Sequence, residues 1–279
     1  MFDFDSQVSD AISFVALGDS LTYGVGDAEG NGWRGWARIL AEALAEHHAV
    51  SFFNAAVPGA TTADVRKHQL ALALDHQPHV ASLIVGLNDV MRSSWTPDKV
   101  HADLLHCASE LDRRGAVLLT ARFHDHGRVL HLPRILGRPF LQRIEAINAA
   151  CDEIQATYGG ISVDLAAQSE IYSASVWSMD RLHPSELGHR MLARKFGELI
   201  NDRGLRFELP SIACSGKQST TMDRARWLVT EVGPWIGRRA RDFAPSTIRF
   251  IAAESQARLS RRRAIAKPAI GDGNVAATI

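Results

Sequence analysis

The chain has 279 residues, 46% of them hydrophobic and 22% charged, which is typical of a globular protein with room for one large domain, or one domain and an extension. Its net charge is zero, but residues 206–279 hold 13 Lys and Arg against 6 Asp and Glu, a net +7, so residues 1–205 carry −7. This balance argues against a nucleic-acid-binding body and predicts an acidic body with a basic appendage.

The N-terminus and the cysteines indicate a cytoplasmic protein. The first ten residues, MFDFDSQVSD, are acidic and lack the basic start and apolar run of a secretory signal. No run approaches the ~18 apolar residues of a membrane-spanning helix. Cys107, Cys151 and Cys214 are far apart and form no CxxC pair. We therefore expect each to be a small buried hydrophobic residue in a reducing compartment.

Short apolar runs alternate with helical patterns as far as about residue 203. The expected strands are 12–17, 50–54, 80–85, 116–121 and 161–165. The expected helices are 36–46, 62–74, 97–113, 141–158 and 184–201. Continuously apolar strands separated by helices predict a parallel sheet covered on both faces, with a ligand site beyond the carboxyl ends of the strands.

Two segments interrupt this alternation. Residues 122–140 form a connection far longer than the ~2–6 residues usual between a strand and a helix, and we expect a lid or binding loop there. Beyond Gly204 the alternation stops. We therefore expect a main domain over 1–203 and a basic, partly helical extension, rich in Trp and Arg and with a weakly structured end, over 204–279.

The first motif with chemical meaning is GDSL, residues 18–21, directly after the first expected strand. A strand-to-helix turn would hold the hydroxyl of Ser20 at the active edge of the sheet, and Gly18 lets the backbone make that turn. A serine hydroxyl is a weak nucleophile unless a base lies within hydrogen-bond reach. By itself the motif more often marks a serine that caps a helix.

A base of the required kind occurs in DRLHP, residues 180–184, after the last expected strand. Asp180 stands three residues before His183 on one loop. It can accept a hydrogen bond from the imidazole and fix its tautomer, which leaves the other ring nitrogen free to take a proton from a serine. In a chain with 12 histidines, this motif alone would more often be a surface histidine before a helix.

Acyl transfer also needs hydrogen-bond donors for the oxyanion that develops on the carbonyl oxygen. Residues 54–60, NAAVPGA, follow the second expected strand, and Gly59 allows the backbone to approach closely. Residues 86–89, GLND, follow the third and supply the side-chain amide of Asn88. Each loop alone is an ordinary turn.

Together these four blocks resemble those of the GDSL/SGNH hydrolase family, in the same order and without departure from the pattern. The resemblance covers residues 12–200. It implies a flavodoxin-like three-layer α/β/α sandwich with a five-stranded parallel sheet, and ester or thioester hydrolysis without metal or cofactor. It also implies that Ser20, Asp180 and His183 form a catalytic triad, and that the Ser20 N–H, the Gly59 N–H and the Asn88 amide form an oxyanion hole.

Other polar groups are weaker candidates. His124 and His126 could hold a metal ion, but the sequence offers no third ligand. The apolar residues of the 122–140 segment could line an acyl pocket or hold the segment in place. Its arginines could face an anionic substrate, although a charge run is more often a solvated face. They are Arg122, Arg128, Arg134 and Arg138.

The extension mixes apolar and basic residues over 224–263, including Trp227 and Trp235. Such a segment can lie in a membrane interface, or it can pack on its own domain or on a second subunit with its arginines outward. We expect packing on protein. The expected partners are thus a small-molecule ester and no nucleic acid, with peripheral membrane binding or self-association through 224–263 left open.

The leading function is hydrolysis of carboxylic esters through an acyl-enzyme intermediate. A thioesterase or a lysophospholipase would use the same triad and stays an alternative. A non-catalytic flavodoxin-like binding protein is the third possibility. Such a protein would have no need of Ser20, Asn88, Asp180 and His183 together.

Overall fold

The computed structural model describes residues 11–214, and residues 1–10 and 215–279 lie outside the described part. Five strands of this part form one sheet: β1 (Ala11–Gly18), β4 (Ala49–Asn54), β5 (Val80–Ile84), β6 (Val117–Arg122) and β7 (Ile161–Asp164). A small hairpin consists of β2 (Ala28–Glu29) and β3 (Gly32–Trp33). The extension predicted to pack through 224–263 lies outside the described residues.

Every strand pairing of the main sheet is parallel, and the strand order is β4-β1-β5-β6-β7. The chain winds from β1 to β4 on one side and then crosses to β5 on the other, so its winding reverses at β1. Sheets wound in this way bind ligands at the reversal, beyond the carboxyl ends of the strands. The predicted flavodoxin-like sheet is confirmed, and it places the end of β1 at the expected binding edge.

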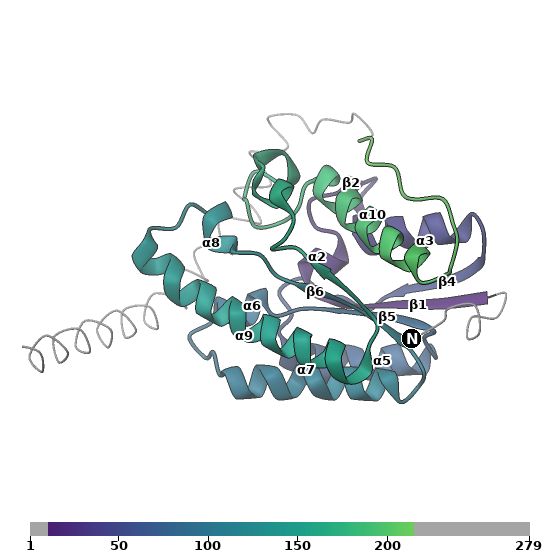
Figure 1. Cartoon of the computed structure of the whole chain (residues 1–279), viewed down its shortest axis with the longest axis horizontal. Coiled ribbons are helices and arrows are strands. Elements are labelled where there is room, and N and C mark those ends of the chain that lie inside the picture. Colours follow the sequence, from purple (N-terminus) through teal and green to yellow (C-terminus); the bar gives the residue numbers. More distant parts are fainter. Residues whose placement is uncertain (1–10, 215–279) are drawn as a thin grey trace, which may run out of the picture.

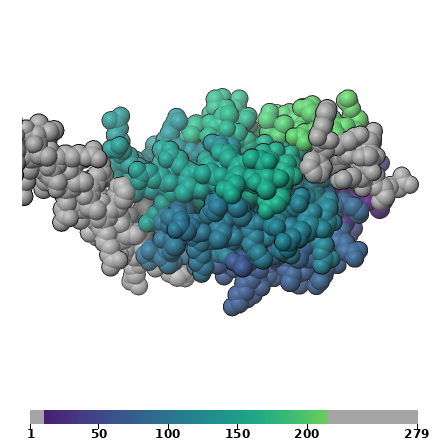
Figure 2. Space-filling view, turned by 60° about the horizontal axis from the view of Figure 1, so that its bottom comes forward, coloured from purple at the N-terminus to yellow at the C-terminus, as the bar shows by residue number. Residues whose placement is uncertain are grey.

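Helices cover both faces of the sheet (Figure 1). One face carries α3 (Gly35–Ala45) and α10 (Glu186–Asp202), and the other carries α5 (Leu70–Asp75), α7 (Pro97–Asp112) and α9 (Arg134–Tyr158). Figure 2 looks toward the second face, where α7 and α9 lie side by side. The buried residues of α10 recur at helical spacing and form one stripe, namely His189, Leu192, Ala193, Phe196, Gly197 and Ile200.

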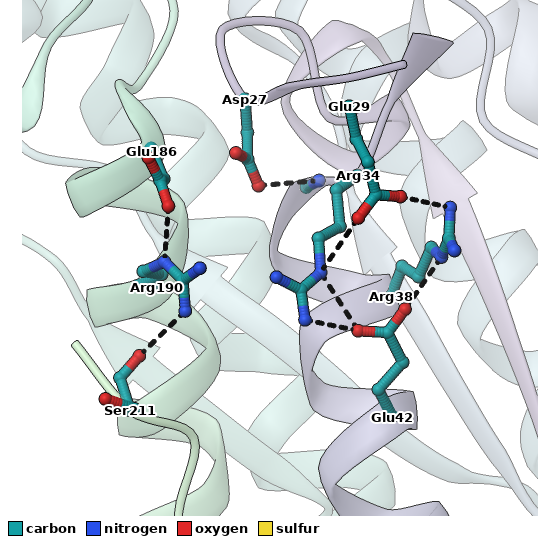
Figure 3. Close-up of polar contacts among 9 residues, drawn as sticks. Asp27, Glu29, Arg34, Arg38, Glu42, Glu186, Arg190 and Ser211 are labelled. Carbon is teal, nitrogen blue, oxygen red and sulfur yellow. Dashed lines mark hydrogen bonds and ion pairs between the residues drawn. The ribbon is translucent and has the colours of Figure 1, made fainter. Parts of the chain in front are cut away.

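Ion pairs fasten the β2–β3 hairpin to α3 (Figure 3). Asp27 accepts a hydrogen bond from the first backbone N–H of α3 at 3.2 Å. Glu29 pairs with Arg38 at 2.9 Å. Glu42 accepts hydrogen bonds from the Nε atoms of Arg34 and Arg38, each at 2.9 Å. The hairpin is thereby held on the face of the sheet that also carries α10. Among the described helices, none is long and apolar enough to cross a membrane.

The chain after α10 remains attached to the body. Leu205 and Phe207 are buried and belong to the main hydrophobic core. The side chain of Asn201 exchanges two hydrogen bonds with the backbone of Phe207, at 3.0 and 3.2 Å. Arg190 donates to the carbonyl of Ser211 at 3.2 Å (Figure 3). The packed body therefore continues past residue 203, where the strand–helix alternation ends.

The 122–140 segment, predicted to be one long loop, is largely helical. It contains α8 (His126–Val129), and α9 already begins at Arg134, so Gly137 and Pro139 lie inside a helix. Both residues disfavour helices, and Pro139 also lacks a backbone donor, which is why the sequence indicates a loop. Phe140 is buried in the core, and this packing outweighs the local preference. The prediction of a loop is wrong from Arg134 onward.

All three cysteines are free thiols. Cys107 and Cys151 are buried, as predicted. Cys214 is exposed, so the prediction of a buried residue is wrong there, because this cysteine lies on the surface in the chain that follows α10.

Candidate active site

Ser20 lies at the turn between β1 and the short helix α2 (Ser20–Tyr23). Gln69, in a π-helical turn that follows α4 (Thr62–Asp64), bonds both the N–H and the C=O of Gly18 at 2.9 Å. A Cβ at Gly18 would lie 2.4 Å from a backbone carbonyl oxygen of β5, so no larger residue fits. Asp19 caps α2 by accepting the backbone N–H two residues ahead at 3.0 Å. The backbone is thus fixed on both sides of Ser20.

A continuous chain of hydrogen bonds joins Ser20 to Asp180. The Oγ of Ser20 lies 2.9 Å from Nε2 of His183, and Nδ1 of His183 lies 2.7 Å from Oδ2 of Asp180. Asp180 also accepts the backbone N–H groups of Leu182 and His183 at 2.9 and 3.1 Å. Burial alone would raise the pKa of Asp180, but these hydrogen bonds and the nearby imidazole hold it below its usual value. The carboxylate therefore stays ionised beside His183.

The loop that carries Gly59 lies against the loop that carries Ser20. Asn54 donates to the carbonyl of Thr22 at 3.0 Å, and the N–H of Val57 donates to the carbonyl of Gly18 at 3.2 Å. Gly59 has φ +82°, a left-handed conformation that favours glycine, and its carbonyl accepts from Arg92 at 3.2 Å. This turn sets the direction of the Gly59 N–H.

Asn88 lies in the short helix α6 (Leu87–Val90), directly after β5. Its amide nitrogen donates to Oδ2 of Asp19 at 3.2 Å and to the carbonyl of Ala60 at 3.1 Å. Asn88 thus contacts both the loop that carries Ser20, through Asp19, and the loop that carries Gly59, through Ala60. Both of its N–H groups have an acceptor, so an oxyanion would have to compete with one of these long bonds.

Comparison with known proteins connects this geometry to a family. Residues 16–191, more than half of the chain, match the model of the GDSL-like Lipase/Acylhydrolase family. The chain belongs to this family. Membership makes it a serine ester hydrolase, and the matched range contains both Ser20 and His183.

The relatives of this family member include esterases. An acetylxylan esterase of Geobacillus stearothermophilus is 25% identical over 203 residues, which are 64% of this chain and 90% of that protein. The structure of a catalytic mutant of Axe2, an acetylxylan esterase from the same organism, has a TM-score of 0.58 at 18% identity and covers 70% of this chain and 96% of its own. A psychrotrophic esterase, EstA from Pseudoalteromonas sp., has a TM-score of 0.55 at 16% identity, with 68% and 97% covered. These structures share the fold.

A cavity of about 400 Å³ opens beside Ser20 in this GDSL-family body. Ser20, Asn88 and His183 are among the residues that line it, whereas Gly59 is not among the described residues that do. Most of the other lining side chains are apolar, and they include Leu21, Leu87, Met91, Phe123, Val176 and Leu192. Such a cavity suits a small, mostly apolar ligand.

Two buried carboxyl groups belong to the motifs themselves, and the sequence analysis assigned them no role: Asp19 of GDSL and Asp89 of GLND. Burial raises the pKa of Asp19 and of Asp89 to about 6 in each case. Asp89 accepts hydrogen bonds from the N–H and the hydroxyl of Thr62 at 3.1 and 3.0 Å, which ties α6 to α4. Both residues stand beside a predicted site residue in the sequence, but only their burial and contacts reveal a supporting role.

The two histidines considered as metal ligands are buried and contact each other. Nε2 of His124 lies 3.0 Å from Nδ1 of His126. These two nitrogens thus share one hydrogen bond, and a metal ion would have to separate them. His124 also lines the cavity beside Ser20.

The arginines of the 122–140 segment do not form an anion site at this cavity. Arg122 pairs with Asp152 and Asp164. Arg128 lies over the ring of Tyr172, 3.7 Å from its centre. Arg134 and Arg138 are exposed. None of these four described side chains lines the cavity, whereas Phe123 of the same segment does.

Proposed function

We propose that Ser20 is the nucleophile of this ester hydrolase and His183 its general base. The observation that carries the proposal is the continuous hydrogen-bond chain from Ser20 through His183 to Asp180. Nε2 of His183 accepts the hydroxyl proton while the Ser20 oxygen bonds to the carbonyl carbon. The same proton then passes to the departing alcohol, and a water molecule, activated by His183, later releases the acid from the acyl-enzyme. Asp180 holds the ring and stabilises its protonated form.

The oxyanion would be stabilised by the N–H groups of Ser20 and Gly59 and by the amide of Asn88. In support, Asn88 lines the same cavity as Ser20, and the Gly59 loop is hydrogen-bonded to the Ser20 loop. The bond from Asn88 to Asp19 is long, at 3.2 Å. A developing oxyanion is more basic than a carboxylate and is therefore the stronger acceptor, so it can attract this donor.

The test is turnover of a graded series of p-nitrophenyl esters by the wild-type chain and by Ser20→Ala. We expect the substitution to lower kcat by about 10⁴-fold or more, leaving what binding and the oxyanion hole supply. A fluorophosphonate probe should label the wild-type chain at Ser20 and leave Ser20→Ala unlabelled. Full hydrolysis by folded Ser20→Ala protein would exclude Ser20 as the nucleophile.

The same residues support two alternative substrates, thioesters and lysophospholipids. Acyl-coenzyme A and lysophosphatidylcholine belong in the substrate panel for that reason. The acetylxylan esterase relative adds acetylated carbohydrate to it. The non-catalytic binding protein predicts no Ser20-dependent turnover of any of these compounds.

We also infer that the enzyme works in the cytoplasm. The three free thiols support this, because exposed and buried cysteines stay unpaired where thiols are kept reduced. Fractionation of the producing cell tests it, and recovery of the chain outside the cytoplasm would contradict it.

A further inference from the structure

The cavity beside Ser20 extends far beyond the catalytic residues. Its lining includes Gly188, Met191 and Lys195 of α10, which recur at intervals of three and four residues and so share one face of that helix. From Gly188 to Glu198, the last lining residue on α10, the helix rises about 15 Å at 1.5 Å per residue. The cavity is therefore an elongated channel along α10.

A second wall of this channel is fixed to α10 by a backbone hydrogen bond and by close packing. It comprises η2 (Ser169–Tyr172) and η3 (Ala174–Val176), from which Ile171 and Val176 reach the channel. The backbone N–H of Ser185 donates to the carbonyl of Val176 at 2.9 Å. A Cβ at Gly188 would lie 2.3 Å from the same carbonyl oxygen, so the wall and α10 approach as closely as glycine permits.

Most of the residues that line the channel are uncharged. His124 is one of them, because burial lowers its pKa to about 4 and its ring is therefore neutral at pH 7. Two cations of the lining are paired on α10, about two turns beyond Gly188: Lys195 and Arg194 contact Glu198 at 3.1 and 3.4 Å. Glu170 of η2 also lines the channel. A largely apolar channel of this kind suits a hydrocarbon chain whose ester group lies at Ser20.

We propose that this channel binds the acyl chain of the ester, so that the enzyme prefers medium-length fatty acyl groups to acetyl groups. The inference rests on the proposed function, because the acyl group must become attached to Ser20. An acetyl group would leave most of the 400 Å³ channel without a ligand. The acyl part stays bound while the alcohol leaves, so a channel bordered by α10 and η3 suits the acyl side.

The first measurement is the chain-length profile of the wild-type chain. Ethyl esters of acetate, butyrate, octanoate and palmitate vary the acyl side. Ethyl acetate and octyl acetate vary the alcohol side. We expect kcat/KM for octanoate to exceed that for acetate at least ten-fold, because each buried methylene contributes about four-fold. A profile with acetate as the best acyl group, or a gain on the alcohol side alone, would overturn the proposal.

The second measurement uses a variant in which a larger side chain fills part of the channel. Met191 lies midway along the lining face of α10, so Met191→Trp should lower the octanoate-to-acetate ratio of kcat/KM by about ten-fold or more. Leu72→Trp is the matched control, because Leu72 is an exposed hydrophobic residue of α5 on the other face of the sheet and does not line the channel among the described residues. It should leave the ratio unchanged. An equal fall of the ratio in both variants, or in neither, would contradict the assignment of the channel.

The two proposals fail in different ways. If Ser20→Ala hydrolyses every ester as the wild type does, the proposed nucleophile is wrong. If Ser20-dependent hydrolysis is observed but falls steadily from acetate to octanoate, the triad stands and the acyl channel is wrong.

Discussion

His183 and His124 line the same cavity, yet their surroundings differ. His183 is half-buried, with the Asp180 carboxylate at 2.7 Å on one ring nitrogen and the Ser20 hydroxyl at 2.9 Å on the other. His124 is 2% exposed and meets the ring of His126 and the face of Trp177. Burial lowers the pKa of His124 to about 4 and that of His126 to about 3.

The difference shows that the neighbours of an imidazole determine what it can do. A carboxylate beside the ring stabilises its protonated form, which a general base must adopt during the reaction. A buried ring that meets only aromatic rings loses this stabilisation and stays neutral, so it serves as part of an uncharged wall. Substitutions around the two histidines test this contrast.

Removal of the carboxylate charge beside His183 should have the largest effect. We expect Asp180→Asn to lower kcat by about 10⁴-fold, because the amide holds the wrong tautomer and does not stabilise the protonated ring. His126→Phe changes the buried pair of His124 and His126 instead, and it should leave kcat for short esters nearly unchanged. Steady-state kinetics with circular dichroism as a folding control decides, and similar losses in both variants would abolish the contrast.

Asn88 lines the cavity together with His183 and Ser20, and its replacement should have the next largest effect on kcat. Asn88→Ala should lower kcat by about 10²–10³-fold with little change in KM, because the amide acts mainly in the transition state. If KM rises while kcat is kept, Asn88 binds the ground state and the oxyanion role is wrong.

The buried histidines His124 and His126 should make the free energy of unfolding depend on pH. The folded-state pKa of His126, about 3, lies below the unfolded value of about 6.5, so only the unfolded state takes up a proton as the pH falls between them. The free energy of unfolding is therefore unaffected above about pH 6.5 and decreases below it, by about 2 kcal/mol per buried histidine at about pH 5. Asp19 and Asp89, with pKa values raised to about 6, act in the opposite sense.

A comparison of variants isolates the histidine contribution. Urea unfolding at about pH 7.5 and about pH 5 should show a smaller loss of stability for His126→Phe than for the wild type. An identical pH dependence in both proteins would mean that His126 can be protonated in the folded state.

The smallest effect concerns a third histidine, which has a carboxylate but little burial. His101 on α7 lies 2.8 Å from Glu153 on α9, and both side chains are exposed. We expect His101→Ala to change the free energy of unfolding by less than about 1 kcal/mol and kcat not at all. A larger loss of unfolding free energy in a urea titration would show that the exposed ion pair of His101 with Glu153 stabilises the fold even without burial.

Most of the sheet, and the residues of the proposed site, could be predicted from the sequence. Continuous apolar runs place all five strands, because a parallel sheet buried on both faces needs such runs. Four short blocks in a fixed order point to Ser20, Asn88 and His183 and to the family, since side chains that follow parallel strands meet at one edge.

Which local preferences are overridden, and what each polar group contacts, follows from long-range packing and could not be predicted from the sequence. Pro139 lies within α9 because burial of Phe140 in the core outweighs the local cost of a proline in a helix. Burial of Leu205 and Phe207 likewise attaches the chain after α10 to the body. The neutrality of His124 and the channel along α10 likewise depend on burial by distant segments. Periodicity and spacing report neighbours along the chain, whereas burial, pKa and cavity shape arise from contacts between residues far apart in it.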